Sequence, residues 1–213
     1  ASISGVGIHT GASTNITLIP AKANSGIRFI RTDLLENPII RASIENVYST
    51  KRSTDLKQDN TEIKTVEHLL AAVAGASIDN LIIEVNNIEI PILDGSAKEF
   101  SELITRTGVI ELSENKKFFE IKRKITYTDD ETGTSLTATP AKEYQIEVEI
   151  DYNSNTLGIQ HAHLQSISDF NNEISSSRTF CFLHELEALI DNNLIKGGNL
   201  NNAIVVVEKE IAK

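Results

Sequence analysis

A glutamate beside a histidine is the most chemically suggestive pair in the sequence. Glu67 and His68 end the segment Thr65-Val-Glu-His68, at the predicted start of a helix. Adjacent helical residues point about 100° apart, yet both can border one site if the histidine ligates a metal ion and the carboxylate reaches its bound water. Zinc hydrolases use three protein ligands, a water and often a nearby carboxylate base. By itself, however, a Glu-His pair is more typical of a helix surface.

Other histidines carry weaker signals. His161 and His163 are spaced to share one face of a strand, where they could grip a metal ion, but a polar strand edge is the favoured interpretation. His184 is expected to face solvent, away from the neighbouring apolar stripe.

Three turn-like segments offer further polar groups. The glycines of the segment 4–11 could admit a phosphate close to the backbone, but the spacing matches neither a dinucleotide motif nor a P-loop and is typical of a turn. Asp94-Gly-Ser96 predicts a turn followed by a helix N-cap. Thr179 has a hydroxyl able to stabilise an oxyanion, although a cap or turn role is favoured from sequence alone.

The elements of the first half must position these residues. Alternating apolar residues predict a strand over 26–31, and an apolar run predicts a buried strand over 81–85. Between them we expect a helix over 66–74, with Thr65 as N-cap and Gly75 as its stop.

A second helix is predicted after the Asp94-Gly-Ser96 turn. Ser96 and Glu99 match a capping box, and Gly108 marks the end. Its apolar stripe consists of Phe100, Leu103 and Ile104.

The second half is predicted to open with strands over 118–127 and 135–139. A half-buried strand with one wet face follows over 144–152, and a buried strand spans 203–207. An amphipathic helix lies between them, marked by Phe182, Leu186, Leu189 and Ile190.

These elements predict an α+β protein of two domains, residues 1–115 and 116–213, joined by a polar linker around 111–117. In each half a helix leads through glycine and an Asn-containing turn into an apolar strand. This similarity between the halves has two equally good explanations. The halves could be duplicated α+β units, or both could use a connection that is common wherever a helix leads into a strand.

Composition sets the remaining bounds. The chain has 213 residues, 40% hydrophobic and 23% charged, as ordinary globular proteins have, and no apolar run long enough for a transmembrane helix. The net charge of −10 argues against a nucleic-acid partner. The basic cluster within 116–124 is expected to be a solvated strand face.

Cys181 is the only cysteine, which indicates a reducing cytoplasm. The sequence has no Met, not even at its start, so either it is an excerpt of a longer protein or methionines are missing from it as written.

Taken in order, six segments are far more specific than any one of them, and together they resemble the UDP-3-O-acyl-N-acetylglucosamine deacetylases, the zinc amidases of lipid A biosynthesis. The resemblance covers nearly the whole chain. It rests on residues 4–11, 65–70, 78–80, 91–96, 177–180 and 197–205.

The resemblance implies two similar α+β domains with the active site between them, and a UDP-linked acylated amino sugar as substrate. It implies that His68 ligates Zn²⁺, that Glu67 is the general base and that Thr179 hydrogen-bonds the tetrahedral oxyanion. Further side chains would meet the fatty acyl chain or the rest of the substrate, namely Phe180, Phe182, Leu186 and His9.

The sequence departs from the family in one respect. The other two zinc ligands of the family come from a later His-Lys-x-x-Asp helix, and another histidine acts as general acid, but no histidine follows His184 here. We therefore expect the second domain to be incomplete and these 213 residues alone to be inactive. Some relatives carry a fused 3-hydroxyacyl-acyl-carrier-protein dehydratase. The alternative hypothesis is a non-catalytic module that binds a nucleotide sugar or lipid.

Overall fold

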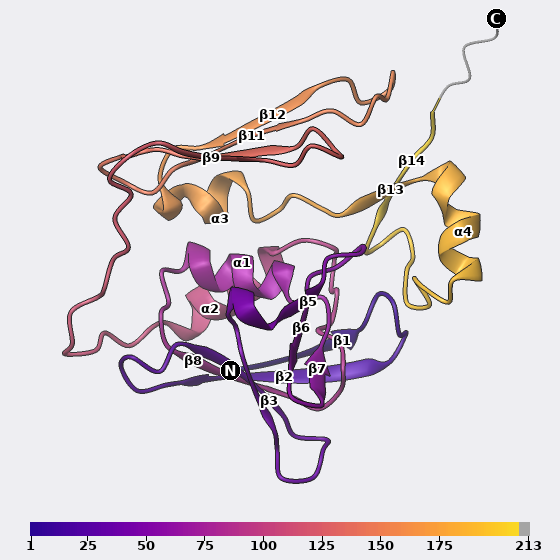
Figure 1. The fold of residues 1–213 in the computed structure, drawn as a ribbon. Helices are drawn as coiled ribbons and strands as arrows, with labels where there is room; N and C mark the ends of the chain where they lie inside the picture. The colour runs from indigo at the N-terminus through magenta and orange to yellow at the C-terminus, as the bar shows by residue number, and fades with distance from the viewer. Residues whose placement is uncertain (209–213) are drawn as a thin grey trace, which may run out of the picture.

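A five-stranded sheet forms the base of the molecule. The computed structural model describes residues 1–208 and confirms a mixed α+β protein (Figure 1). Neighbouring strands of the sheet are antiparallel except β3 and β8, which are parallel. In sheet order the strands are β1 (Ser2–Val6), β2 (Ser13–Pro20), β8 (Leu81–Val85), β3 (Ile27–Arg31) and β4 (Ile39–Arg41).

Two helices, α1 (Glu67–Gly75) and α2 (Lys98–Thr107), cover one face of this sheet (Figure 1). Side chains of both helices and the sheet form one buried core, which includes Phe29, Leu69 and Phe100. A smaller sheet lies beside it, built from β5 (Val47–Ser49), β6 (Asp55–Gln58) and β7 (Thr61–Ile63), with a short 3₁₀ turn at Ile44–Asn46 before β5.

The structure confirms both predicted helices of the first half but corrects how they begin. Val66 and Ala97 occupy the N-cap positions, and neither helix has a side-chain cap. Thr65 instead donates its hydroxyl to Glu89. Ser96 bonds with Asp94 rather than forming a box with Glu99. The predicted Thr65 cap and the Ser96–Glu99 box are therefore wrong, although the Ser96 hydroxyl still accepts from the Lys98 amide at 3.1 Å at the start of α2.

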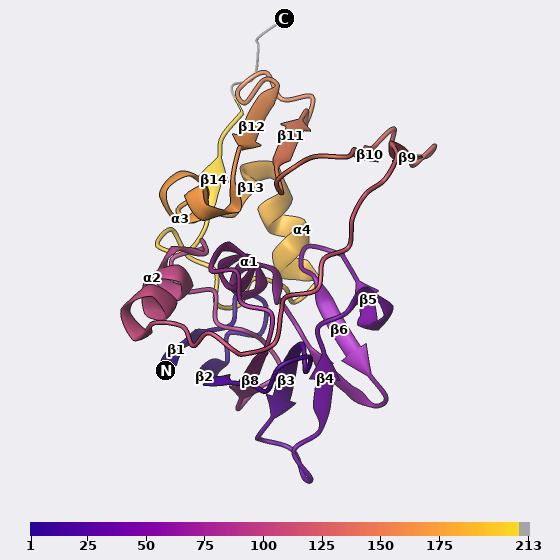
Figure 2. The same cartoon turned by 90° about the vertical axis from the view of Figure 1, so that its left-hand side faces the viewer.

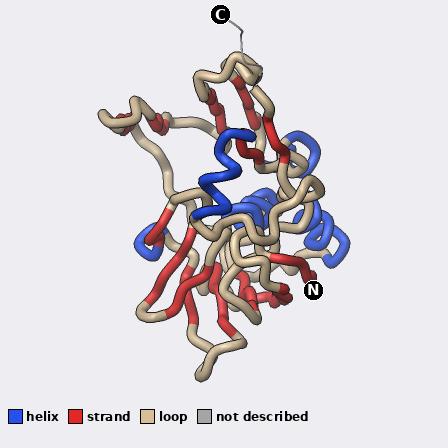
Figure 3. Tube along the Cα trace, turned by 90° about the vertical axis from the view of Figure 1, so that its right-hand side faces the viewer, coloured by secondary structure: helices blue, strands red, loops and turns tan. Residues whose placement is uncertain are grey.

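The second half lies on the side of α1 and α2 away from the large sheet (Figure 1). Two hairpins come first, and the β9–β10 hairpin projects away from the β11–β12 hairpin (Figure 2). Loops join most of its short elements (Figure 3). These are β9 (Ile125–Thr128), β10 (Ser135–Ala138), β11 (Ile146–Ile150), β12 (Gln160–Leu164), a 3₁₀ turn (Ile167–Asp169), α3 (Phe170–Glu173), β13 (Phe180–Phe182), a 3₁₀ turn (Leu183–Glu185), α4 (Leu186–Asp191) and β14 (Ile204–Val206).

Predictions for the second half are only partly confirmed. The strand expected over 118–127 is regular only from Ile125, and Phe119 before it is 91% exposed. The strand over 144–152 forms at its centre, but neither face is buried, as the 39% exposure of Val148 shows. The helix expected from Phe182 begins later, because Phe180–Phe182 pairs with β14 instead. The predicted second domain extends past residue 208, so its last five residues lie outside the described part.

Hydrogen bonds between backbones dock the second half onto the turn before α2. The Thr179 amide donates to the Gly95 carbonyl at 2.8 Å, and the Ile204 amide donates to the Thr179 carbonyl at 3.0 Å. Gly95 has φ +86°, and a Cβ on it would lie 2.1 Å from the Asn202 carbonyl oxygen. Glycine is required here because the two backbones leave no room for a side chain.

Substitution of Gly95 should loosen this docking. Gly133 is a matched control, since its φ is +72° and no heavy atom lies within 4 Å of a Cβ built there. Both Gly→Ala variants carry the strain of a left-handed backbone, about 1 kcal/mol. We expect Gly95→Ala to lower the free energy of unfolding by a further ~1–3 kcal/mol from overpacking. Equal losses in denaturant unfolding of the two variants would contradict the docking role.

Candidate functional site

A small cavity of about 70 Å³ lies where the two halves of the chain meet. Its lining includes three of the residues that the sequence singled out for chemistry, Glu67, His68 and Thr179. The remaining lining residues are Ile8, His9, Arg52, Thr65, Ile92, Phe180, Cys181, Leu189, Ile195 and Ala203.

Glu67 and His68 both line the cavity from the first turn of α1. Their side chains leave the helix about 100° apart, so a site located between them can be reached by both. The Glu67 carboxylate accepts a hydrogen bond at 2.9 Å from the backbone amide of Thr54. In turn the Val66 amide donates to the Thr54 carbonyl. The start of the helix is therefore tied to the segment before β6, and Glu67 is held by a neutral donor.

The environment of His68 favours its neutral form. Burial lowers its pKa, while the negative charges of Glu67 and Asp94 oppose that shift. Zinc binds the neutral imidazole, so His68 fits a zinc ligand and Glu67 fits a carboxylate beside it. Within residues 1–208 no group of three or more His, Cys, Asp or Glu side chains is arranged to hold a metal ion.

His9 enters the cavity from the glycine-containing turn after β1. The turn closes through backbone hydrogen bonds, from the Gly7 amide to the Ala12 carbonyl and from the Gly11 amide to the Gly7 carbonyl. The His9 Nδ1 atom is buried and has no hydrogen-bond partner among the described residues.

The glycines of this turn serve close packing. A Cβ on Gly7 would lie 2.3 Å from the Glu89 carboxylate, and one on Gly197 would lie 2.3 Å from the Gly7 carbonyl. The Gly197 amide also donates to the Ile8 carbonyl at 3.0 Å. Because protein atoms occupy the space beside these glycines, the segment is a packed turn, as the favoured interpretation expected.

Thr179 faces the cavity from the opposite side, just before β13. Its amide and carbonyl are both engaged by backbone partners, Gly95 and Ile204. The backbone is thus fixed without using the hydroxyl, which leaves that group available to a ligand.

Of the aromatic and aliphatic residues expected along an acyl passage, Phe180 lines the cavity, whereas Phe182 and Leu186 are not in its lining. Phe182 is buried against Phe180, with ring centroids 5.7 Å apart, and also packs on Tyr152. Leu186 begins α4, the helix that contributes Leu189 to the cavity.

Sequence reasoning missed Arg52 as a cavity residue and considered Cys181 only for its redox state. Burial raises the pKa of the Cys181 thiol. Arg52 forms a 2.5 Å ion pair with Glu185 across the two halves, and its guanidinium lowers the pKa of that carboxyl. Nothing in the Lys-Arg-Ser segment around Arg52 signals a cavity residue, because basic residues are common on any surface.

The other histidines lie away from the cavity. His161 and His163 are exposed on β12, and His161 is 3.5 Å from Glu149 on the neighbouring strand. His184 is exposed, as predicted, but its ring stacks on Phe182 with centroids 5.3 Å apart, so the expectation that it points away from the apolar stripe is wrong. The favoured interpretation of a polar strand edge therefore agrees with the structure.

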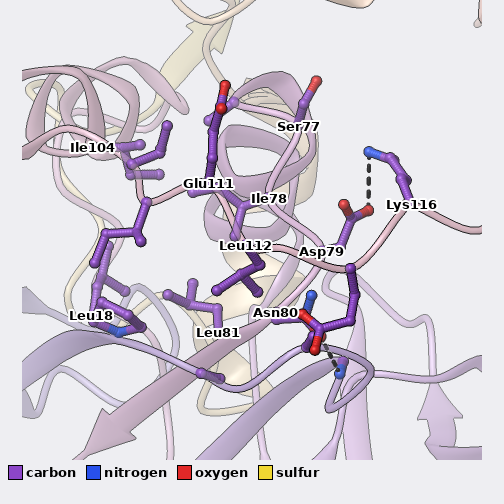
Figure 4. Close-up of a pocket in the computed structure, with 18 of the residues that line it drawn as sticks. Leu18, Ser77, Ile78, Asp79, Asn80, Leu81, Ile104, Glu111, Leu112 and Lys116 are labelled. Carbon is purple, nitrogen blue, oxygen red and sulfur yellow. Dashed lines mark hydrogen bonds and ion pairs between the residues drawn. The ribbon is translucent and has the colours of Figure 1, made fainter.

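A larger cavity of about 1010 Å³ lies under the segment that joins the two halves (Figure 4). Its walls include Leu81, Ile104 and Leu112. An ion pair of 2.9 Å between Lys116 and Asp79 fastens the joining segment over it. Residues 111–117 form neither helix nor strand, as predicted. No histidine lines this cavity, so the smaller one is the better candidate for chemistry.

Within residues 1–208, no helix has both the length and the apolar character needed to cross a bilayer.

Comparison with known proteins identifies relatives along the whole chain. The bifunctional enzyme LpxC/FabZ of Porphyromonas gingivalis is 39% identical over 99% of this chain and 46% of its own length. The UDP-3-O-acyl-N-acetylglucosamine deacetylases of Myxococcus xanthus and Saccharophagus degradans are 42% and 43% identical, over 99% and 95% of this chain and 67% of their own lengths.

The chain thus spans about half the length of the bifunctional relatives and two thirds of the single-function ones. The model of the LpxC family, UDP-3-O-acyl N-acetylglycosamine deacetylase, matches residues 1–213. The resemblance seen in the ordered motifs is therefore confirmed, and this chain belongs to the UDP-3-O-acyl N-acetylglycosamine deacetylase family.

Proposed function

We propose that the protein hydrolyses the acetamide of a UDP-3-O-acyl-N-acetylglucosamine, with zinc as cofactor, in lipid A biosynthesis. Relatives of about 40% identity carry the name of this deacetylase, which supports the reaction. The observation that carries the proposal is the meeting of Glu67, His68 and Thr179 at one cavity from distant parts of the chain.

The described side chains suit amide hydrolysis. Glu67 takes a proton from the attacking water, and the water oxygen bonds to the acetamide carbon. The Thr179 hydroxyl donates to the carbonyl oxygen as negative charge develops there. Cleavage of the C–N bond then gives acetate and the free amine of the sugar, as a separate general acid protonates the departing nitrogen and Glu67 afterwards releases its proton to water.

His68 would hold the zinc ion, which when bound supplies Lewis-acid polarisation and acidifies water. The neutral state that burial favours for His68 supports this role. We propose that the other zinc ligands and the general acid belong to the portion of the deacetylase relatives that these 213 residues do not match.

The apolar part of the substrate requires an apolar surface. Phe180 is in the cavity lining, Phe182 packs against it, and Leu186 begins the helix that contributes Leu189 to the lining, so we assign them to the acyl chain. His9, whose Nδ1 lacks a described partner, would contact the polar part of the substrate. We place the reaction in the cytoplasm, as the single cysteine indicates.

The general-base role predicts the behaviour of Glu67→Gln in the full-length, zinc-loaded protein. The amide oxygen of Gln can still accept from the Thr54 amide, so the fold and the zinc content should be retained. We expect turnover to fall on the order of 100-fold or more, because general-base catalysis contributes that much. Acetate release and zinc per chain are measured together.

Glu102→Gln is the matched control, because it makes the same change on an exposed helix position away from the cavity. It should leave turnover unaltered. Full activity of Glu67→Gln would rule out the base assignment.

The oxyanion role predicts a difference between two substitutions of Thr179. Valine keeps the shape of threonine but has no hydroxyl, whereas serine keeps the donor. Both retain the backbone hydrogen bonds to Gly95 and from Ile204. We expect kcat to fall about 100-fold in Thr179→Val, as it does when one oxyanion donor is removed, and to recover largely in Thr179→Ser. Equal kcat values for the two variants would contradict the role.

A further inference from the structure

A carboxylate that the proposed chemistry does not use lies directly behind the cavity. Glu89 is 0% exposed, although it is an acidic residue. Among residues 1–208 it forms no ion pair with a Lys, Arg or His side chain. Burial of a carboxylate is costly unless hydrogen bonds replace its water shell, so its partners must supply that compensation.

Four donors converge on the two oxygens of Glu89. Oε1 accepts from the His9 amide at 2.9 Å and from the Thr65 hydroxyl at 3.0 Å. Oε2 accepts from the Thr10 amide at 2.8 Å and from the Thr10 hydroxyl at 2.6 Å. Each oxygen is therefore satisfied, and loss of the carboxylate would leave buried donors without a partner.

These partners come from two separate segments, each of which contributes a residue to the cavity lining. His9 and Thr10 lie in the turn after β1, whereas Thr65 lies two residues before Glu67. One carboxylate thus joins the turn that carries His9 to the segment that starts α1. The absence of a side chain on Gly7 makes room for this carboxylate, since a Cβ there would lie 2.3 Å from Oε2.

Thr65 needs such support because its backbone is strained. Its φ is +59°, in the left-handed region that a β-branched residue rarely adopts. Two carboxylates hold it, Asp55 accepting from its amide at 3.2 Å and Glu89 accepting from its hydroxyl. Strained residues held by their surroundings concentrate at functional sites, and this one sets the direction in which Glu67 and His68 leave the strand region.

We propose that Glu89 is a positioning residue that fixes the His9 turn relative to Glu67 and His68, and that turnover depends on this link. The inference rests on the proposed deacetylase function. Glu89 acts through Thr65 and the turn and does not itself touch the substrate, because it is fully buried.

Two substitutions in the full-length, zinc-loaded protein test the link. Glu89→Gln replaces one acceptor oxygen with an NH₂ group that faces donors. Thr65→Val removes one hydrogen bond while keeping the shape and the β-branch. A misplacement of about 1 Å can cost on the order of 100-fold in rate, so we expect kcat to fall at least ~10-fold in both variants, with KM changed less than about threefold.

Two further variants and two measurements separate positioning from stability. Thr65→Ser keeps the hydroxyl and should recover most of the kcat lost in Thr65→Val. Thr14→Val is the matched control, because Thr14 is a buried threonine whose hydroxyl has no partner among the described residues. It should leave kcat unaltered. Zinc per chain should remain unchanged in every folded variant, and amide hydrogen exchange at His9 and Thr10 should quicken in Glu89→Gln.

Each outcome decides the question. If Glu89→Gln does not fold, the comparison of Thr65→Val with Thr65→Ser decides alone. An active parent enzyme whose folded Glu89→Gln and Thr65→Val variants keep full kcat would overturn this inference and leave the deacetylase proposal standing. A lower thermal midpoint with full kcat has the same meaning, because the role is then structural. An inactive parent enzyme would overturn the function and this inference with it.

Discussion

The close approach of two backbones, at Gly95 and Asn202, is the constraint on which the candidate site depends. The Thr179 amide donates to the Gly95 carbonyl, and the Thr179 carbonyl accepts from Ile204, so one ladder runs from the turn before α2 into the β13–β14 pair. Because backbone atoms make these bonds, the position of Thr179 is insensitive to most side-chain changes around it. It is sensitive to any Cβ at Gly95.

The opposite wall of the cavity is built differently. There, side-chain carboxylates hold the backbone: Asp55 and Glu89 secure Thr65, and Glu67 itself accepts from Thr54. A carboxylate with several N–H and O–H donors is stabilised without a cation, so these acids are held in place without a basic side chain bonded to them. The position of Thr179 therefore depends on glycine at position 95, whereas the positions of Glu67 and His68 depend on buried carboxylates.

In the first half the sequence predicts both helices and the strands β3 and β8, because burial leaves an apolar run in Leu81–Val85 and a clear helical period along α2, but it predicts none of the other strands there. In the second half it places several strands but not their burial, because Val148 and its neighbours expose both faces and the alternation no longer reports a buried face. The Thr65 N-cap fails because a distant carboxylate, Glu89, takes its hydroxyl, and the capping box of Ser96 fails because Ser96 bonds with the neighbouring Asp94. An acid within the apolar run around Glu89 was a signal of a buried carboxylate. The meeting of Thr179 with His68 leaves no local pattern, so only the ordered motifs pointed to it.

The most direct test of the central claim follows the fate of the acetyl group. The full-length protein, loaded with zinc, is mixed with UDP-3-O-acyl-N-acetylglucosamine carrying an isotopic label in its acetyl group, and the products are followed by NMR. The account predicts labelled acetate and the free amine in equal amounts, with the ester-linked acyl chain intact. Substrate that binds but stays acetylated would contradict the account and favour a binding module. Release of the acyl chain instead would assign the cavity to a different hydrolysis.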